Sequence, residues 1–466
     1  MQAIIVTLDR LATTALGCYG NEWIETPHLD RLASEAVVFD RHFAEQVGSL
    51  AGTSLGTGRL PRDASTATAE SDGAWSNVTA AAGVELHLLR ECDAQSWSLA
   101  FQTKTRTSVE SQHELNPQPD AIPFARLVRA ACATLAEPRG TASRIVWLHS
   151  AGIPEPWLPP EGFATLYFED YEERGCDMSA VTADNWGTHP AVYAGYVSLI
   201  DHWLGELLTA VKTSAATEPT LLVFVAARGC DWTKEPSPRR EFIDLDDDET
   251  PAVLELLTTD LERDAATSAE ATAVETTLPT EVAPVRVHQA AVPRPTHSLT
   301  EMVTRTPLFV RLFDGESFDS EFAGTRSNRL VQTADLAATL LHFFQLPTSP
   351  AIIHGRSLLN ELAETEAPRE TVCFTDGTGA RGIRTAKWSC LVQDATVERA
   401  PLAEHELVEL EPTVQLFAKP EDYWEVNEVS GQQRDVAATL IERLNATLPA
   451  SRSLEDQNWH TVCQVL

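Results

Sequence analysis

The amino-acid sequence predicts an α/β protein built around a large, mostly parallel sheet. Two observations point to this class: short β-rich apolar runs, and helical patterns between them. The runs that we expect to be buried strands are Ala3 to Leu8, Ser96 to Phe101, Arg144 to His149 and Thr220 to Ala226. Strands that alternate with helices in this way are typical of parallel sheets that are covered by helices on both faces.

The period of the apolar residues predicts where the helices lie. The clearest helix spans Tyr193 to Val211, where apolar side chains recur every three or four residues. A second, over Asp335 to Phe344, is apolar nearly all round, which predicts that it is buried. A third helix is expected around Pro27 to Glu35, directly after the first strand.

Two polar segments interrupt this pattern. The acidic run Asp244 to Glu249 introduces a stretch rich in Ala, Thr, Glu and Pro, in which residues 265–284 contain no aromatic residue. Because so little apolar area is available to offset the entropy of ordering the chain, we expect a flexible insertion over about 244–295. Residues 64–82, rich in Ala, Ser and Thr, are expected to form a smaller loop of the same kind.

The charge of the chain narrows the choice of partners. Its 466 residues include 68 acidic and 35 basic ones, so the net charge is −33 and the pI is about 4.7. An acidic protein of this kind repels nucleic-acid phosphates and anionic lipids, so neither nucleic acid nor a membrane is expected as a partner. An anionic small molecule or a protein partner stays open, as does the oligomeric state.

Apolar runs and cysteines predict the compartment. No apolar run is long enough to span a bilayer, and the N-terminal run Ala3 to Val6 becomes polar too soon for a signal peptide. The eight cysteines are scattered without close pairs, which favours buried free thiols over a zinc site or a disulfide framework. We therefore expect a cytoplasmic protein.

Short motifs in a fixed order connect the chain to a known family. They begin at the end of the first strand with Asp9 and continue as LGCYGN (16–21), TPHLDRLA (26–33), TGRLP (57–61), RTPLFVR (305–311), GRSLL (355–359), RTAKW (384–388) and PEDYWEVNEV (420–429). In sequence and order, these motifs resemble those of the sulfatase branch of the alkaline-phosphatase-like superfamily, whose members are sulfuric ester hydrolases.

This resemblance implies an alkaline-phosphatase-like fold in two parts. Residues 1–365 would form the large α/β domain, with the flexible insertion inside it. Residues 366–466 would form a C-terminal subdomain with a small antiparallel sheet and a terminal helix, which we place at Val436 to Leu448.

The family's nucleophile has no counterpart here. In sulfatases it is a formylglycine hydrate, made from Cys or Ser in a C/S-x-P-x-R motif. Counting back from Thr57, Gly48 takes the place of the modified residue and Gly52 that of the Arg. Glycine has no side chain to oxidise or to attack with, so we expect no formylglycine. Ser49 stands one residue away and is expected to be an ordinary loop serine.

The family's Ca²⁺ or Mg²⁺ site is also degraded. Such cations require six or more oxygen ligands. Asp9 matches the first ligand, but Arg10 follows where the family often has a second Asp, and the later ligand pair falls on Ala227 and Arg228. We therefore expect no bound metal. Because Asp9 and Arg228 both end parallel strands, we predict that they pair with each other instead.

Some of the residues that would hold sulfate and donate a proton are also replaced. Pro154 replaces the second His of a family motif that begins at His149, and His149 itself is expected to have a structural role at a strand end. Thr296 replaces a Lys of the family, while the neighbouring His297 remains. No catalytic set is left intact.

Three functional hypotheses follow. The leading one is a catalytically inactive pseudoenzyme with a binding or structural role, in which Arg10, Arg228 and His297 offer an anion site. The second is an active sulfate or phosphate ester hydrolase with a rearranged site, whose nucleophile would be Ser49, Thr53 or Ser54. The third is an interaction scaffold that acts through the 244–295 insertion.

Overall fold

The computed structural model describes most of the chain. The described residues are 1–47, 53–60, 74–91, 103–110, 117–138, 140–173, 186–216, 218–233, 299–313, 322–348, 353–377, 379–393, 396–399, 407–410 and 413–448. The expected strand Ser96 to Phe101, the motif positions Gly48 to Gly52, the pair Thr296 and His297, and the 244–295 insertion lie outside these residues.

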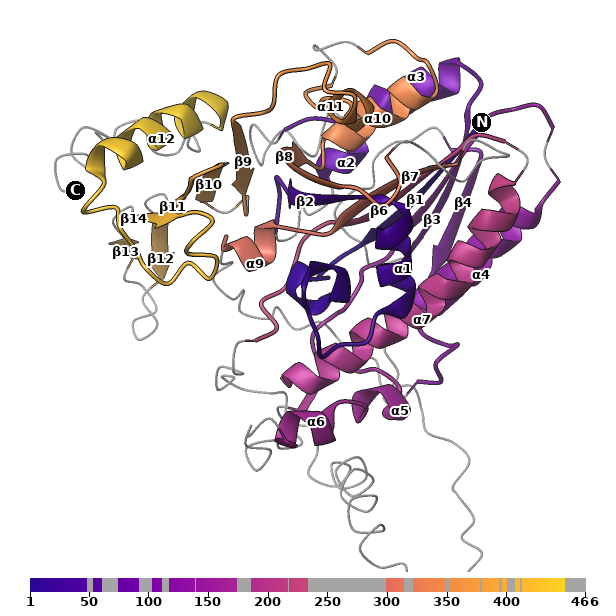
Figure 1. Cartoon of the computed structure of the whole chain (residues 1–466), viewed down its shortest axis with the longest axis horizontal. Coiled ribbons are helices and arrows are strands. Elements are labelled where there is room, and N and C mark those ends of the chain that lie inside the picture. The colour runs from indigo at the N-terminus through magenta and orange to yellow at the C-terminus, as the bar shows by residue number, and fades with distance from the viewer. Residues whose placement is uncertain are drawn as a thin grey trace, which may run out of the picture.

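A mixed, mostly parallel sheet forms the centre of the molecule (Figure 1). Within the described residues it has eight strands, in the order β4-β3-β5-β1-β6-β7-β2-β8. Only β7 runs antiparallel to its neighbours β6 and β2. The strands are β1 Gln2–Leu8, β2 Val37–Phe43, β3 Glu85–Glu91, β4 Thr105–Val109, β5 Arg144–His149, β6 Thr220–Ala226, β7 Leu308–Phe313 and β8 Arg326–Gln332. The mostly parallel sheet predicted from the sequence is thereby confirmed.

Helices cover both faces of this sheet (Figure 1). On one face lie α1 (Pro27–Glu35), α4 (Pro123–Ala136) and α7 (Pro190–Ala215), which share a core with Ile4, Val6 and Leu8 of β1. Ala3 and Ile5 point to the other face, because successive side chains of a strand alternate. That second core contains α2 (Thr53–Thr57), α3 (Ala74–Ala81), α10 (Asp335–Phe343) and α11 (Leu358–Leu362).

The helix predicted over Tyr193 to Val211 is confirmed and is longer than expected. α7 begins at Pro190, whose fixed φ suits the first helical position. The His189 ring accepts a hydrogen bond from the Ala191 amide at 3.2 Å and caps the helix. These two residues lie before the apolar period, which is why the period alone placed the start too late.

The loop expected over 64–82 is wrong for its last part, because α3 spans Ala74–Ala81. Trp75 is fully buried, donates its indole N–H to the Leu55 carbonyl at 3.1 Å and packs 5.8 Å from the Trp147 ring. The composition that suggested a loop includes alanine, which is the strongest helix former. Burial of Trp75 therefore stabilises a helix that the polar composition of residues 64–82 does not predict.

A second sheet forms the C-terminal part of the molecule. Its four antiparallel strands in the described residues follow the order β14-β11-β10-β9, and α12 (Arg434–Thr447) packs on Ile383, Cys390 and Leu416 of this sheet. The strands are β9 Thr371–Thr375, β10 Ala380–Thr385, β11 Trp388–Gln393 and β14 Thr413–Ala418, with a separate pair β12 Thr396–Arg399 and β13 Leu407–Leu410. The small antiparallel sheet and its terminal helix are as expected.

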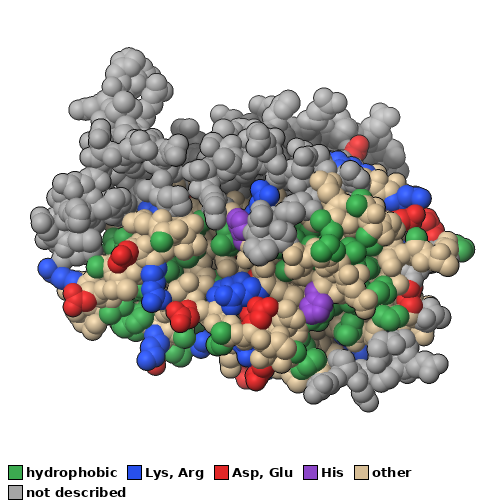
Figure 2. Space-filling model, turned by 90° about the horizontal axis from the view of Figure 1, so that it is seen from above, with side chains coloured by type: hydrophobic (Ala, Val, Ile, Leu, Met, Phe, Trp, Pro, Cys, Tyr) green, Lys and Arg blue, Asp and Glu red, His purple; other side chains and the backbone are tan. Residues whose placement is uncertain are grey.

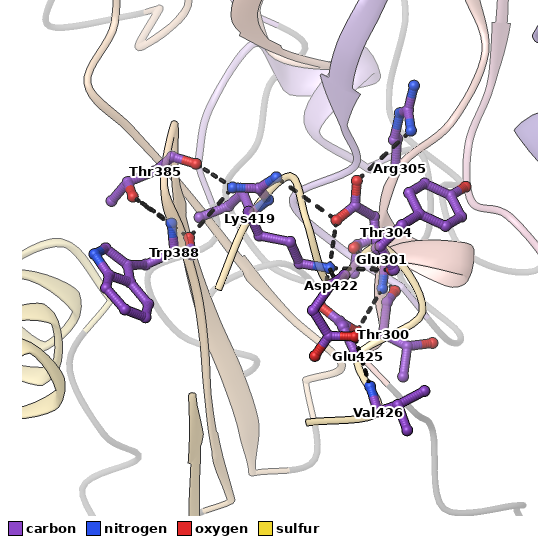
Figure 3. A network of polar contacts seen from close by, with 12 residues as sticks. Thr300, Glu301, Thr304, Arg305, Thr385, Trp388, Lys419, Asp422, Glu425 and Val426 are labelled. Atoms are coloured by element: carbon purple, nitrogen blue, oxygen red, sulfur yellow. Dashed lines mark hydrogen bonds and ion pairs between the residues drawn. The ribbon is translucent and has the colours of Figure 1, made fainter. Parts of the chain in front are cut away.

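A buried ionic network joins the C-terminal part to α9 (Glu301–Thr304), which lies between the two sheets (Figures 1 and 3). The ammonium of Lys419, whose side chain is fully buried, lies 2.7 Å from Glu301 Oε2 and 3.2 Å from Glu425 Oε1. It also donates to the carbonyls of Asp422 and Tyr423 at 2.8 and 3.1 Å. A charge taken out of water is stable only with such partners, so the network holds the 419–425 loop on α9.

Two further expectations concern helices and thiols. Among the residues that the structure covers, no helix is both long and apolar enough to cross a bilayer. The described cysteines are free thiols, as predicted: Cys18, Cys132, Cys230, Cys373 and Cys390.

Replacing Lys419 tests the ionic network. Lys419→Met removes the ammonium that pairs with the buried Glu425, whereas Glu301 keeps Arg305 and Arg384 at 3.6 Å each. Because the charge of Glu425 then stays buried without Lys419, we expect the free energy of unfolding in urea to fall by about 3–5 kcal/mol. The matched control is Lys387→Met, at an exposed position of the same subdomain, which should change stability by no more than about 0.5 kcal/mol. Equal effects of the two substitutions would contradict the role given to Lys419.

Candidate functional site

The register of β1 and β6 brings Asp9 and Arg228 to the same edge of the large sheet. Leu8 lies opposite Ala226 in a parallel pair, and the Ala227 amide donates to the Leu8 carbonyl at 2.6 Å. Both chains therefore leave the sheet side by side. The C-terminal edge of parallel strands is where α/β proteins assemble their sites.

Asp9 and Arg228 form a two-pronged ion pair. Arg228 Nε lies 2.9 Å from Asp9 Oδ1 and Nη2 lies 3.0 Å from Oδ2, while the Arg10 amide donates to Oδ1 at 3.0 Å. The exposed fractions are 19% for the Asp9 side chain and 13% for that of Arg228. Burial acts to lower the pKa of Arg228, but the charge and hydrogen bonds of Asp9 outweigh it and raise that pKa. The predicted pairing is confirmed.

These residues do not fit the divalent cation that the family resemblance implies. Both carboxylate oxygens of Asp9 accept from Arg228, and Ala227 offers only a methyl group. At an effective dielectric near 20, two unit charges about 4 Å apart interact by about 4 kcal/mol, so Arg228 would repel a cation beside Asp9. In the part of the chain that the structure covers, no group of three or more His, Cys, Asp or Glu side chains is placed to hold a metal.

The loop that carries Asp9 and Arg10 is held by its backbone. Arg10 adopts a left-handed conformation with φ of 58°, which a non-glycine residue rarely adopts without support. The Tyr193 hydroxyl supplies that support, donating to the Arg10 carbonyl at 2.9 Å and accepting from the Ala12 amide at 3.0 Å. On the other side, a Cβ added at Gly152 would lie 1.7 Å from the Asp9 carbonyl oxygen, so only glycine fits there.

His149 is the last residue of β5, at the strand end predicted for it. Its Nδ1 lies 2.8 Å from the hydroxyl of Thr7, which donates to the Leu148 carbonyl at 3.0 Å. The hydroxyl proton is therefore in use, so the contacts assign the imidazole proton to Nδ1. Burial lowers the pKa of His149 to about 4, against the opposing charge of Asp9. These are the contacts of a histidine that ties β5 to β1.

The structure describes only some of the remaining site positions. Pro154 is half-buried and follows the turn in which the Ile153 amide donates to the Asp9 carbonyl at 3.2 Å. Ser54 is 2% exposed and its hydroxyl lies 3.5 Å from Gln46 Oε1. Gly48, Ser49, Gly52, Thr296, His297 and the side chain of Thr53 lie outside the described residues. Hence the structure joins Asp9, Arg10, Arg228 and the turn before Pro154 at one sheet edge.

Two supports of the site escaped the sequence interpretation. The helical period identifies Tyr193 only as an apolar residue, and the sequence prediction assigns no role to Gly152. A glycine three residues after a strand end is a recognisable sign of close backbone approach, so Gly152 could have been flagged. Nothing in the sequence marks the Tyr193 hydroxyl, because its partners come from the distant residues Arg10 and Ala12.

The large sheet, the helices that cover it and the site at its C-terminal edge together define an α/β protein of the alkaline-phosphatase-like class. Solved structures share this fold. The phosphonate monoester hydrolase of Agrobacterium radiobacter superposes with a TM-score of 0.61 at 13% identity, covering 96% of this chain and 95% of that one. A protein solved in complex with its substrate, D-glucosamine-2-N,6-O-disulfate, also gives 0.61 at 13% identity, covering 96% of this chain and 97% of its own.

Sequence comparison gives the family. Residues 2–346 match the family model named Sulfatase, and the chain belongs to the sulfatase family. A segment of 41 residues is 49% identical to steryl-sulfatase of Mus musculus, which is 9% of this chain and 7% of that protein.

A double-mutant cycle tests the ion pair. Asp9→Ala and Arg228→Met each leave one charge partly buried and unpaired, so each should lower the free energy of unfolding by about 3 kcal/mol, and the double variant should lose less than the sum. Urea denaturation measures all three variants. The exposed pair Glu85 and Lys104 is the control, and its coupling should stay below about 1 kcal/mol. Additive losses at Asp9 and Arg228 would refute the pairing.

His149 should also shape the dependence of stability on pH. An unfolded histidine binds a proton near its ordinary pKa of 6.5, whereas folded His149 does so only near 4. Protons therefore bind preferentially to the unfolded chain in this window, and stability falls as pH drops from 6.5 to 4. His149→Asn, which keeps a donor for Thr7, should flatten this fall in urea titrations. The exposed His202→Asn should leave it unchanged, and equal slopes in all three proteins would exclude this role.

Proposed function

We propose that this chain is a catalytically inactive member of the sulfatase family that serves a binding or structural role. The single observation that carries the proposal is the two-pronged pair of Arg228 with Asp9, at 2.9 and 3.0 Å, on the sheet edge where family members would hold a cation. A fixed guanidinium there neutralises the carboxylate permanently. It can neither coordinate a sulfate ester as a Lewis acid nor position a metal-bound nucleophile.

The nucleophile position supports the same proposal. Gly48 stands where sulfatases carry the Cys or Ser that becomes formylglycine, and glycine offers no atom for that oxidation. Ser54, one of the alternative nucleophiles, is buried, and its hydroxyl lies 3.5 Å from Gln46 Oε1, which is not a base that could take its proton. The proposal is therefore that nucleophile and cation have both been lost.

The binding role that we propose for this edge includes an oxyanion. Arg228 uses Nε and Nη2 on Asp9, and Nη1 stays on the other side of its planar guanidinium. Burial and the charge of Glu155 raise the pKa of Cys230 to about 12, and the charges of Arg10 and Arg228 oppose this rise. Arg10, Arg228, Glu155 and Asp231 thus all act on this spot. The role that we propose for the two arginines is to hold a sulfate or phosphate group without turning it over.

The cellular setting is part of the proposal. Free thiols at Cys230 and Cys390 suit a reducing compartment, and we place the protein in the cytoplasm. The net charge of −33 favours a small anion held in an arginine site, or a protein partner, over nucleic acid or a membrane surface.

Absence of turnover is the direct test. The protein, co-expressed with a formylglycine-generating enzyme, should hydrolyse aryl sulfates, aryl phosphates and aryl phosphonate monoesters only at the background rate, with or without Ca²⁺ or Mg²⁺. Mass spectrometry of the peptide spanning Gly48 to Thr57 should find no modified residue. A sulfatase with an intact C-x-P-x-R motif is the positive control. Metal-dependent turnover that Ser49→Ala abolishes would replace this proposal with a rearranged hydrolase.

A further inference from the structure

A cavity of about 470 Å³ lies where the large sheet meets the C-terminal subdomain. Its walls include Gln332 at the end of β8, His354 and Arg356 before α11, Arg369 in the connection to β9, and Cys373 and Thr447 of the small subdomain. Asp9, Arg10 and Arg228 are not among its lining residues. The volume is in the range of small-molecule sites.

One buried carboxylate organises three walls of this cavity. Asp335 accepts from Arg369 Nη1 and Nη2 at 2.6 Å each, and it also accepts the backbone amides of Gln332 at 2.7 Å and Arg356 at 2.8 Å. Asp335 is fully buried at the start of α10, so its position is fixed by the core. The donors around the cavity are therefore held in place before any ligand arrives, which lowers the entropy cost of binding.

Unused donors point to an acceptor as the missing partner. Arg369 donates from Nη1 to Asp335 and to the Leu330 carbonyl, and one of its two Nη2 protons goes to Asp335. Its Nε–H and second Nη2–H have no hydrogen bond to another described residue.

The charge at the rim is also suited to an anion. Arg356 is 42% exposed, and its only carboxylate contact in the described residues is with Glu361 at 3.8 Å. Glu370 lines the cavity as well, but Arg443 lies 3.5 Å from its carboxylate and offsets its charge. The face above α10 and α11 mixes basic and acidic side chains instead of gathering acidic ones (Figure 2).

We propose that this cavity binds a small metabolite through a carboxylate or phosphate group, held by Arg356 and Arg369. Planar guanidinium groups match the several acceptor oxygens of such an oxyanion. Because the cavity is built from both parts of the molecule, a bound ligand would also connect the large sheet to the small subdomain.

Binding of simple anions to the full chain tests the proposal. Inorganic phosphate, sulfate and citrate would each be titrated by calorimetry and by the shift in melting temperature. We expect saturable binding of phosphate or citrate, which distinguishes the phosphate from the carboxylate source. Arg356→Gln and Arg369→Lys should each weaken it by about tenfold, as expected for one lost hydrogen bond to a charged group. Arg369→Lys keeps a positive charge beside Asp335, so the fold should be preserved.

Arg31→Gln, at an exposed position of α1 outside the cavity lining, is the matched control and should leave this binding unchanged. If none of the three anions binds, or if binding survives both Arg356→Gln and Arg369→Lys, the cavity is not an oxyanion site. Binding lost only in Arg10→Gln would likewise overturn the inference, and it would assign the anion to the Asp9 edge.

Discussion

The charge of Asp9 must be balanced, and much of the candidate site follows from how this is done. Asp9 comes directly after a strand whose seven residues are all buried, so its carboxylate cannot move away into water. A partly buried carboxylate is costly without a partner. Arg228, placed opposite by the register of β1 and β6, supplies a counter-ion that cannot dissociate. Asp9 is thus balanced by a charge that belongs to the chain itself.

Supports on two sides explain why this edge keeps a strained backbone. Arg10 holds its left-handed conformation because Tyr193 and the turn at Gly152 fix the loop from two sides. Such conformations persist only where the surroundings over-determine them. The supports come from α7 and from the residues after β5, which belong to the fold itself. They would therefore remain in place whether or not the edge still performed chemistry.

The parts of this structure that depend on local pattern could be predicted from the sequence. The bounds expected for β5, β6 and α1 agree with the structure, because buried β-branched runs and an amphipathic period are local signals. The Asp9–Arg228 pair followed from topology, since parallel strands end at one edge. By contrast, burial of Lys419 could not be foreseen, because lysine is almost never fully buried and its partners lie 118 and 6 residues away.

The motifs that this chain shares with sulfatases make structural contacts. The positions that differ are those at which the resemblance places catalytic residues. In LGCYGN, a Cβ added at Gly17 would lie 2.4 Å from the Asp30 carboxylate, and Asn21 Oδ1 accepts the amides of Trp23 and Ile24 at 2.8 and 2.7 Å. Asp30 itself belongs to TPHLDRLA.

The late motif follows the same rule, because Glu425 anchors Lys419 and accepts the Glu301 amide at 2.9 Å. Each of these contacts would be needed to fold the chain even if it bound no metal. In our proposal, Gly48, Ala227 and Arg228 stand where the resemblance to sulfatases places side chains used in the reaction. Structural contacts that are kept beside such changes are what we expect of a protein selected for its fold and not for hydrolysis.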